Sequence, residues 1–186
     1  MISILMGILI AVAVIIVAVF VYFYNSIVVL GNRIDNAWSQ IDVQLKKRAD
    51  LVPNLIETVK GYVKHEKGVF TAVTEARSEW MKATTPADKA KAGNVLAGAL
   101  KSVFAVAENY PELKASENFK VLQEELSGIE NKIAYSRQFY NDAILSYNNT
   151  ITTIPGIWFA GMMGKTEKKI YLEIKPVERE VVKVSF

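Results

Sequence analysis

The chain has 186 residues, of which 51% are hydrophobic and 22% charged, so it is more apolar than an ordinary soluble domain. It contains no cysteine, which excludes a disulfide framework, a thiolate metal site and a cysteine nucleophile and leaves the redox compartment undetermined. Its net charge of +3 comes from intermixed signs, so we expect no nucleic-acid partner.

The first segment, residues 1–24, is uncharged and almost wholly apolar, with only Ser3 and Gly7 interrupting it. At about 1.5 Å per residue, a helix of this length crosses the roughly 30 Å hydrocarbon layer of a bilayer. The alternative is a cleaved signal peptide, for which residues 11–13 would suit as a small-residue cleavage site. A signal peptide, however, has a basic first region and a shorter apolar core, so we expect a retained transmembrane anchor over residues 1–25.

Aromatic and basic residues predict the orientation of this anchor. Tyr22, Phe23 and Tyr24 suit the membrane interface, where amphipathic rings prefer to lie. The first charged side chain is Arg33, and a basic group follows at residues 46–48. By the positive-inside rule, this asymmetry predicts a single-pass protein of the cell (inner) membrane with its N-terminus outside and its C-terminal domain in the cytoplasm.

Apolar residues beyond the anchor recur every three or four positions, which is the spacing of one helix face. We therefore expect an all-α domain over residues 26–153, built of four helical runs. The runs extend from Ile27 to Val52, from Ile56 to Trp80, from Leu96 to Ala107 and from Phe119 to Ile151.

Capping residues and prolines mark the expected boundaries between these runs. Thr85 before Pro86 and Asp88 is typical of a helix start, with Thr85 as N-cap and proline at the first position. We expect Pro111 to end the third run and Ser116 to cap the fourth.

Residues 50–53 leave two alternatives open. Asp50 as an N-cap with Pro53 in the first turn would begin a new helix and reverse the chain, whereas Pro53 inside a continuous helix would only kink it. With a reversal, the end of the fourth run lies near the bilayer. With a kink, it lies far away.

An uncharged segment at residues 154–164 follows the fourth run, which we expect to end at Pro155. It is too short to span a bilayer. Its aromatic and methionine side chains beside lysines favour a membrane-interface segment, and the alternatives are bundle core or a subunit contact. The predicted interface residues here are Trp158, Phe159, Met162, Met163 and Lys165. The rest of residues 154–186, with β-favouring stretches at 170–172 and 181–184, predicts an extended tail.

Residues typical of active sites are few. His65 is the one histidine, so a two-histidine metal site cannot form within the chain. Neither a phosphate-binding glycine loop nor a G-x-S-x-G nucleophile elbow occurs. Acidic residues of the fourth run, such as Glu130, are interleaved with Lys132 and Arg137, as on a solvated face. We therefore expect no catalytic residue, no metal, no cofactor and no enzyme activity.

Asparagines recur in the helical runs, although asparagine is a mediocre helix former. One explanation is a polar layer that crosses the helices and fixes their register, and another is a contact between subunits. The alternative is a set of solvated side chains without a shared role. The candidates for the polar network or subunit contact are Arg33, Asn36, Asp50, Asn131, Tyr135, Arg137 and Asn141.

Two long motifs resemble the LemA family. They are NRIDNAWSQIDVQLKKRADLVPNLIETVKGYVKHE at residues 32–66 and ENYPELKASENFKVLQEELSGIENKIAYSRQFYNDAILSYNNTI at residues 108–151, and the N-terminal anchor and Pro155 match as well. The tail departs from the usual family ending. The resemblance implies a prokaryotic membrane protein whose cytoplasmic part is an antiparallel four-helix up-and-down bundle, and it favours a reversal near Asp50. It brings no enzyme activity with it.

The resemblance also associates the chain with membrane organisation, including a relative in magnetosome membranes, and with membrane proteases and envelope stress. Our first hypothesis is a non-enzymatic, self-associating scaffold that organises or remodels the inner membrane. The alternative is a membrane-anchored adaptor that regulates a membrane protease or an envelope-stress system. The expected partners are the lipid bilayer, further copies of the chain and a membrane-protein client.

Overall fold

A computed structural model describes residues 2–63 and 66–172. The expectations for His65 and for the extended stretch at residues 181–184 lie outside the described residues.

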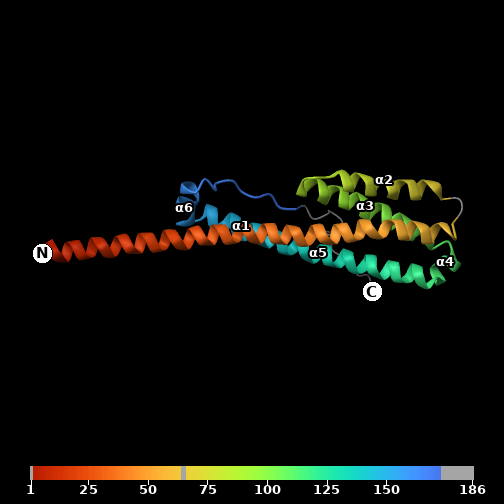
Figure 1. The fold of residues 1–186 in the computed structure, drawn as a ribbon, viewed down its shortest axis with the longest axis horizontal. Coiled ribbons are helices and arrows are strands. Elements are labelled where there is room, and N and C mark those ends of the chain that lie inside the picture. Colours follow the sequence, from red (N-terminus) through yellow and green to blue (C-terminus); the bar gives the residue numbers. More distant parts are fainter. Residues whose placement is uncertain (1, 64–65, 173–186) are drawn as a thin grey trace, which may run out of the picture. The chain divides into compact units, whose positions relative to one another are not determined.

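The described residues form six helices and no strand, which confirms the all-α class (Figure 1). The chain divides into two compact units, a terminal unit of residues 1–37 and 139–186 and a central unit of residues 38–138. The longest helices, α1 and α5, contribute to both units. The helices are α1 (Ile2–Lys60), α2 (Lys67–Lys82), α3 (Pro86–Ala107), α4 (Pro111–Ala115), α5 (Glu117–Thr152) and α6 (Gly156–Met162).

Helix α1 begins with the one described stretch that is long and apolar enough to cross a membrane. An 18-residue window of it has a mean hydropathy of 3.4, and none of that window is buried. The core helix of a soluble protein can be equally apolar, but it is mostly buried against its neighbours. The start of α1 therefore offers a free apolar surface suited to a bilayer.

Helix α1 continues through Pro53 to Lys60, so the reversal near Asp50 is wrong. Proline has no N–H, and inside a helix it leaves the carbonyl four residues earlier without its usual partner. That carbonyl belongs to buried Ala49, and the Nε–H of Arg77 in α2 donates to it at 2.8 Å. A side chain from the next helix thus replaces the hydrogen bond that proline removes, and a single helix passes this position.

Helix α1 ends at Lys60 and α2 begins at Lys67, so the single run expected from Ile56 to Trp80 is wrong. Val59 and Val63 are both buried, and the Val63 N–H still donates to the Val59 carbonyl at 3.0 Å. Val63 is therefore a buried apolar residue at helical spacing beyond the end of α1. For this reason the periodicity of apolar positions does not reveal where α1 ends.

The start of α3 is confirmed. The Oγ1 of Thr85 accepts from the Asp88 N–H at 3.1 Å, and Pro86 occupies the first turn. Pro111 was expected to end the third run, but α3 already ends at Ala107 and Pro111 begins α4. Because proline is pre-shaped for a first helical turn, it starts this short helix.

Polar contacts align the helices of the central unit. The Nζ of Lys89 in α3 lies 2.7 Å from a carboxylate oxygen of Asp42 in α1, and Nη2 of Arg48 donates to the Gly93 carbonyl at 2.7 Å. The residue with the higher number on α1 contacts the residue with the higher number on α3, so these two segments run parallel. Helix α2 packs beside α3 (Figure 1) and runs antiparallel to it.

The central parts of α1 and α5 run antiparallel. Residues 39–44 of α1 line a groove with residues 132–136 of α5, and residues 47–51 line another with residues 125–132. Higher numbers on α1 thus meet lower numbers on α5.

Replacing Arg77 by Met is expected to lower the free energy of unfolding by about 1–3 kcal/mol, because the buried Ala49 carbonyl loses its donor. In a Pro53→Ala background, residue 53 supplies its own N–H, so the same change should cost less. Unfolding of the full chain in detergent micelles, followed by circular dichroism, gives the four values of this double-mutant cycle. Lys82→Met, on an exposed position of α2, is the control. An equal Arg77→Met effect in both backgrounds would contradict this account.

Candidate membrane-boundary site

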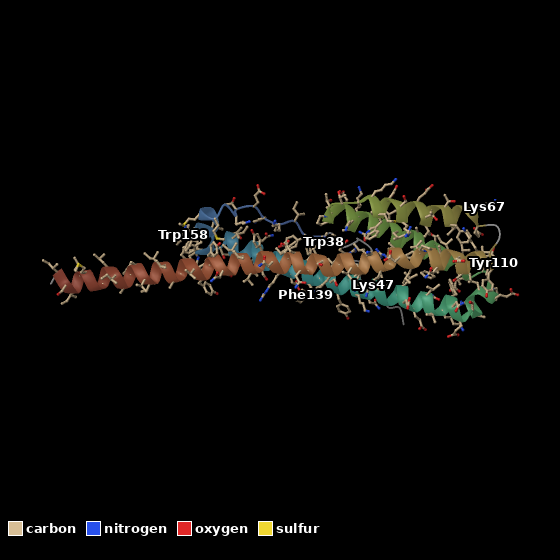
Figure 2. The ribbon with its side chains drawn as sticks, viewed as in Figure 1. Trp38, Lys47, Lys67, Tyr110, Phe139 and Trp158 are labelled. Carbon is tan, nitrogen blue, oxygen red and sulfur yellow. The ribbon has the colours of Figure 1, made fainter. Side chains whose placement is uncertain are left out.

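Helix α6 lies beside the apolar part of α1 (Figures 1 and 2). The ring of Phe159 stacks on that of Phe23, with centroids 5.3 Å apart and planes 14° from parallel, and it meets Phe20 edge-on at 5.9 Å. Gly156 permits the start of α6 to approach the end of α5, since a Cβ there would clash with the Thr150 carbonyl oxygen. The aromatic contact holds α6 where the apolar part of α1 approaches its end. The expectation that the end of the fourth run lies far from the anchor without a reversal at residues 50–53 is therefore wrong, because the chain turns back after Lys60 instead.

The outer side of α6 is apolar and exposed. Trp158 is 62% exposed and Met162 is 74% exposed, whereas Gly156 and Ala160 are buried. A short helix with one buried face and one exposed aromatic face is the arrangement of an interfacial helix. The exposed side chains of Trp158 and Met162 therefore belong to a helix that packs on the apolar part of α1.

The other residues predicted at the membrane interface lie close to α6. Tyr22 and Tyr24 flank Phe23 on α1, and their rings are exposed. Met163 packs against the apolar cluster of the terminal unit, and exposed Lys165 follows it. Their contact with lipid stays a prediction.

A glycine turn ends α6. Gly164 has φ = +65°, a left-handed conformation that glycine adopts without steric cost. The Lys165 N–H donates to the Ala160 carbonyl at 2.9 Å, and the Gly164 N–H donates to the Gly161 carbonyl at 3.2 Å. This pair of bonds is a Schellman C-cap, and it turns the chain away from the axis of α6.

Two asparagines of α5 hold the next segment by its main chain. Nδ2 of Asn148 donates to the Lys169 carbonyl at 2.9 Å, and its Oδ1 accepts from the Lys169 N–H at 2.8 Å. Asn141 forms the same pair of bonds with Leu172, at 3.1 and 3.0 Å. We call these four residues the tail clamp.

The spacing of the tail clamp shows that the held segment is extended. Asn141 and Asn148 are seven positions apart, which is about 10.5 Å along a helix. Lys169 and Leu172 are three positions apart and span about 10 Å only in an extended chain. Between them, Ile170 is 87% exposed, so the clamp recognises the main chain and leaves that side chain free.

The residues predicted as a polar network or subunit contact lie in both units. Arg33, Asn36 and Asn141 belong to the terminal unit, and Asp50, Asn131, Tyr135 and Arg137 belong to the central unit. Asn141 is part of the tail clamp, and Nη2 of Arg137 donates to Oδ1 of Asn94 at 2.7 Å. The other five are exposed, which suits a subunit contact better than a buried layer. A shared role for them stays a prediction.

A buried arginine that we did not predict joins three helices of the central unit. Arg48 is 2% exposed, its Nη1 donates to a carboxylate oxygen of Glu130 at 2.5 Å, and its Nη2 donates to the Gly93 carbonyl. Burial lowers the pKa of the Arg48 guanidinium from its ordinary value, and the Glu130 carboxylate opposes that shift by favouring the charged form. A Cβ on Gly93 would lie 2.9 Å from Leu45, so glycine permits the helices to approach.

The sequence did contain a signal for Arg48. The apolar stripe of α1 steps from Leu45 to Val52, seven positions, and Arg48 occupies the skipped inward position. A charged residue at a core position predicts a buried partner.

The model of the LemA family matches residues 37–186. The chain belongs to the LemA family. In the described part of this LemA-family chain, no group of three or more His, Asp or Glu side chains is placed to hold a metal ion.

Several known proteins are identical to this LemA-family chain at about a quarter of the aligned positions. Magnetosome protein MamQ 2 of Paramagnetospirillum magneticum is 25% identical over 82% of the chain and 65% of its own length. Protein LemA of Metamycoplasma hominis is 28% identical over 74% of the chain and 65% of its own length. Magnetosome protein MamQ of Magnetospirillum gryphiswaldense is 24% identical over 76% of the chain and 61% of its own length. The chain thus spans less than two thirds of the length of these relatives.

Replacing both Asn141 and Asn148 by Ala should release the tail segment, because four hydrogen bonds to its main chain are lost. Trypsin cleavage after Lys165, Lys168 and Lys169 should become roughly tenfold faster, as followed by mass spectrometry on the full chain in micelles. Asn149→Ala, an exposed neighbour on α5, is the control. Equal cleavage rates in all three proteins would show that the clamp does not hold the tail.

Trp158 is expected to lie at lipid depth, since it is exposed beside the anchor and indole rings favour the interface. In vesicles that contain brominated lipid, wild-type tryptophan emission should fall, and most of this loss should be absent in Trp158→Phe. Trp80→Phe, at a buried position of α2, is the control and should retain the loss. The interface placement is wrong if Trp158→Phe is quenched as strongly as the wild type.

Proposed function

We propose that this LemA-family chain is a non-enzymatic, single-pass membrane scaffold that self-associates and organises or remodels the inner membrane. The observation that carries this proposal is the packing of Phe159 on Phe20 and Phe23. It joins a short helix with an exposed aromatic face to the end of an unburied apolar stretch. With the anchor inserted, α6 occupies area in one leaflet, and such insertion is curvature-sensitive.

The proposed topology places the N-terminus outside and the helical domain in the cytoplasm. The support is the distribution of basic residues, which begin at Arg33 and cluster at residues 46–48, all on the C-terminal side of the anchor.

We further propose that α1, α2, α3 and α5 form the up-and-down four-helix bundle of the family in the central unit. The support is the set of contacts that pair α1 with α3 in parallel, α1 with α5 antiparallel, and Arg77 of α2 with the carbonyl of Ala49. The buried Arg48 then occupies the bundle interior, where a single polar contact set fixes the register of the helices.

The surface proposed for self-association is the groove of the central unit lined by residues 39–44 and 132–136. Tyr135 is 75% exposed there and Val43 is 48% exposed. An exposed aromatic ring beside an exposed aliphatic side chain is the kind of apolar surface that a neighbouring subunit would cover.

Replacing Tyr135 and Val43 by Ser should weaken self-association at least about tenfold, since aromatic anchors dominate interface energies. Energy transfer between two differently labelled populations in vesicles, at a fixed protein-to-lipid ratio, measures the association. Val121→Ser, an exposed apolar position elsewhere on α5, is the control. Electron microscopy of the wild type with lipid should show ordered assemblies or altered membrane shape, and uniform monomers at high protein density would contradict the scaffold.

The tail clamp favours a second candidate, an adaptor that regulates a membrane protease or another envelope client. Asn141 and Asn148 hold an extended main chain, which is also how many proteins hold peptide segments of a partner. Crosslinking in cells distinguishes the candidates. If the chain is an adaptor, one other protein should be recovered with it in stoichiometric amount, and the Asn141 and Asn148 substitutions should abolish that recovery. If it is a scaffold, the crosslinked products should be mainly further copies of the chain.

A further inference from the structure

A polar cavity of about 430 Å³ lies in the terminal unit, between α1, α5 and the segment that follows α6. Its inner wall is apolar and buried, made by Ile27, Ile34 and Tyr147. Residues 164–167 and Lys169 form its outer wall. Its volume falls within the range of small-molecule binding sites.

The structure fixes both ends of the outer wall. The Schellman turn at Gly164 begins it, and the hydrogen bonds between Asn148 and the main chain of Lys169 end it. The outer wall is therefore a short loop fixed at both ends by hydrogen bonds, and its side chains are held beside the cavity.

Two cations and two anions line the cavity. They are Lys165, Lys169, Asp35 and Glu167, and all four are exposed. None of them forms an ion pair with another described residue. Four charges of balanced sign, none ion-paired within the part of the chain that the structure describes, suit a ligand that carries both a negative and a positive group.

The cavity lies next to the membrane boundary. Its α1 residues run from Ile27 to Asp35, which at 1.5 Å per residue is about 5 to 16 Å beyond Tyr24, the last α1 residue predicted at the membrane interface. The headgroup layer of a bilayer is several ångströms thick on each side of the hydrocarbon core. The lower part of the cavity is thus level with lipid headgroups once α1 is inserted.

We infer that this cavity binds the headgroup of an amine-bearing glycerophospholipid, of the phosphoethanolamine class. Lys165 and Lys169 bind the phosphate, and Asp35 and Glu167 accept hydrogen bonds from the primary ammonium. This inference deepens the proposed function and rests on insertion of the anchor. An anionic glycerol headgroup would leave both carboxylates unpaired, and a quaternary choline group has no N–H to donate to Asp35.

Native mass spectrometry of the full chain, released from micelles with an equal mixture of ethanolamine, glycerol and choline phospholipids of identical acyl chains, tests the inference. One ethanolamine lipid per chain should be retained, with at least a fivefold preference over either other class. Asp35→Asn and the double change Lys165→Gln, Lys169→Gln should each abolish the preference. Lys168→Gln is the matched control, because Lys168 does not line the cavity and should leave the preference unchanged.

Each other outcome overturns the inference. A preference for the glycerol or choline lipid, no preference at all, or a preference that survives both sets of substitutions with helix content intact would do so. Soluble glycerophosphoethanolamine, if it competed as well as the lipid at equal concentration, would show that the ligand is a free metabolite. Flotation of the wild type with vesicles tests the anchor separately, so loss of flotation contradicts the proposed function, whereas flotation without headgroup preference contradicts the cavity alone.

Discussion

The packing of Phe159 against Phe20 and Phe23 is the contact on which the terminal unit depends. It joins a seven-residue helix, too short to be stable alone, to a helix long enough to cross a bilayer. Gly156 and Ala160 give α6 a flat inner face, so Trp158 and Met162 remain outside. Because α6 is held there, the Gly164 turn and the tail clamp return the chain along α5 and enclose the polar cavity.

The central unit depends on how its buried polar groups find partners. Arg48 would be costly inside a helical core, but the Glu130 carboxylate and the Gly93 carbonyl satisfy two of its nitrogens. Arg77 does the same for the carbonyl that Pro53 leaves free. Both arginines therefore use a main-chain carbonyl of a neighbouring helix, and both fix the register of one helix against another.

Asparagine has a structural role in this LemA-family chain that its low helix propensity conceals. Asn141 and Asn148 offer one donor and one acceptor each, the same pair that an extended backbone presents. The tail segment held in this way forms one wall of the polar cavity. The same feature is what an adaptor would need, so the membrane-boundary site and the tail clamp connect the two proposed functions.

The apolar anchor, the all-α class, the cap at Thr85 and the LemA family were readable from residues alone, because hydropathy, helical spacing and capping act over a few neighbouring positions. The passage through Pro53 was not readable, since the donor that permits it, Arg77, lies 24 positions further on in α2. The partners of Arg48 were likewise hidden, because Gly93 and Glu130 come from separate helices. Asn141 was predicted to have a polar partner, but that partner is the main chain of Leu172, and main-chain groups leave no mark in a sequence. These contacts depend on which carbonyl and carboxylate groups the fold brings within hydrogen-bond distance. They are therefore determined by the packing of segments that are distant in the sequence.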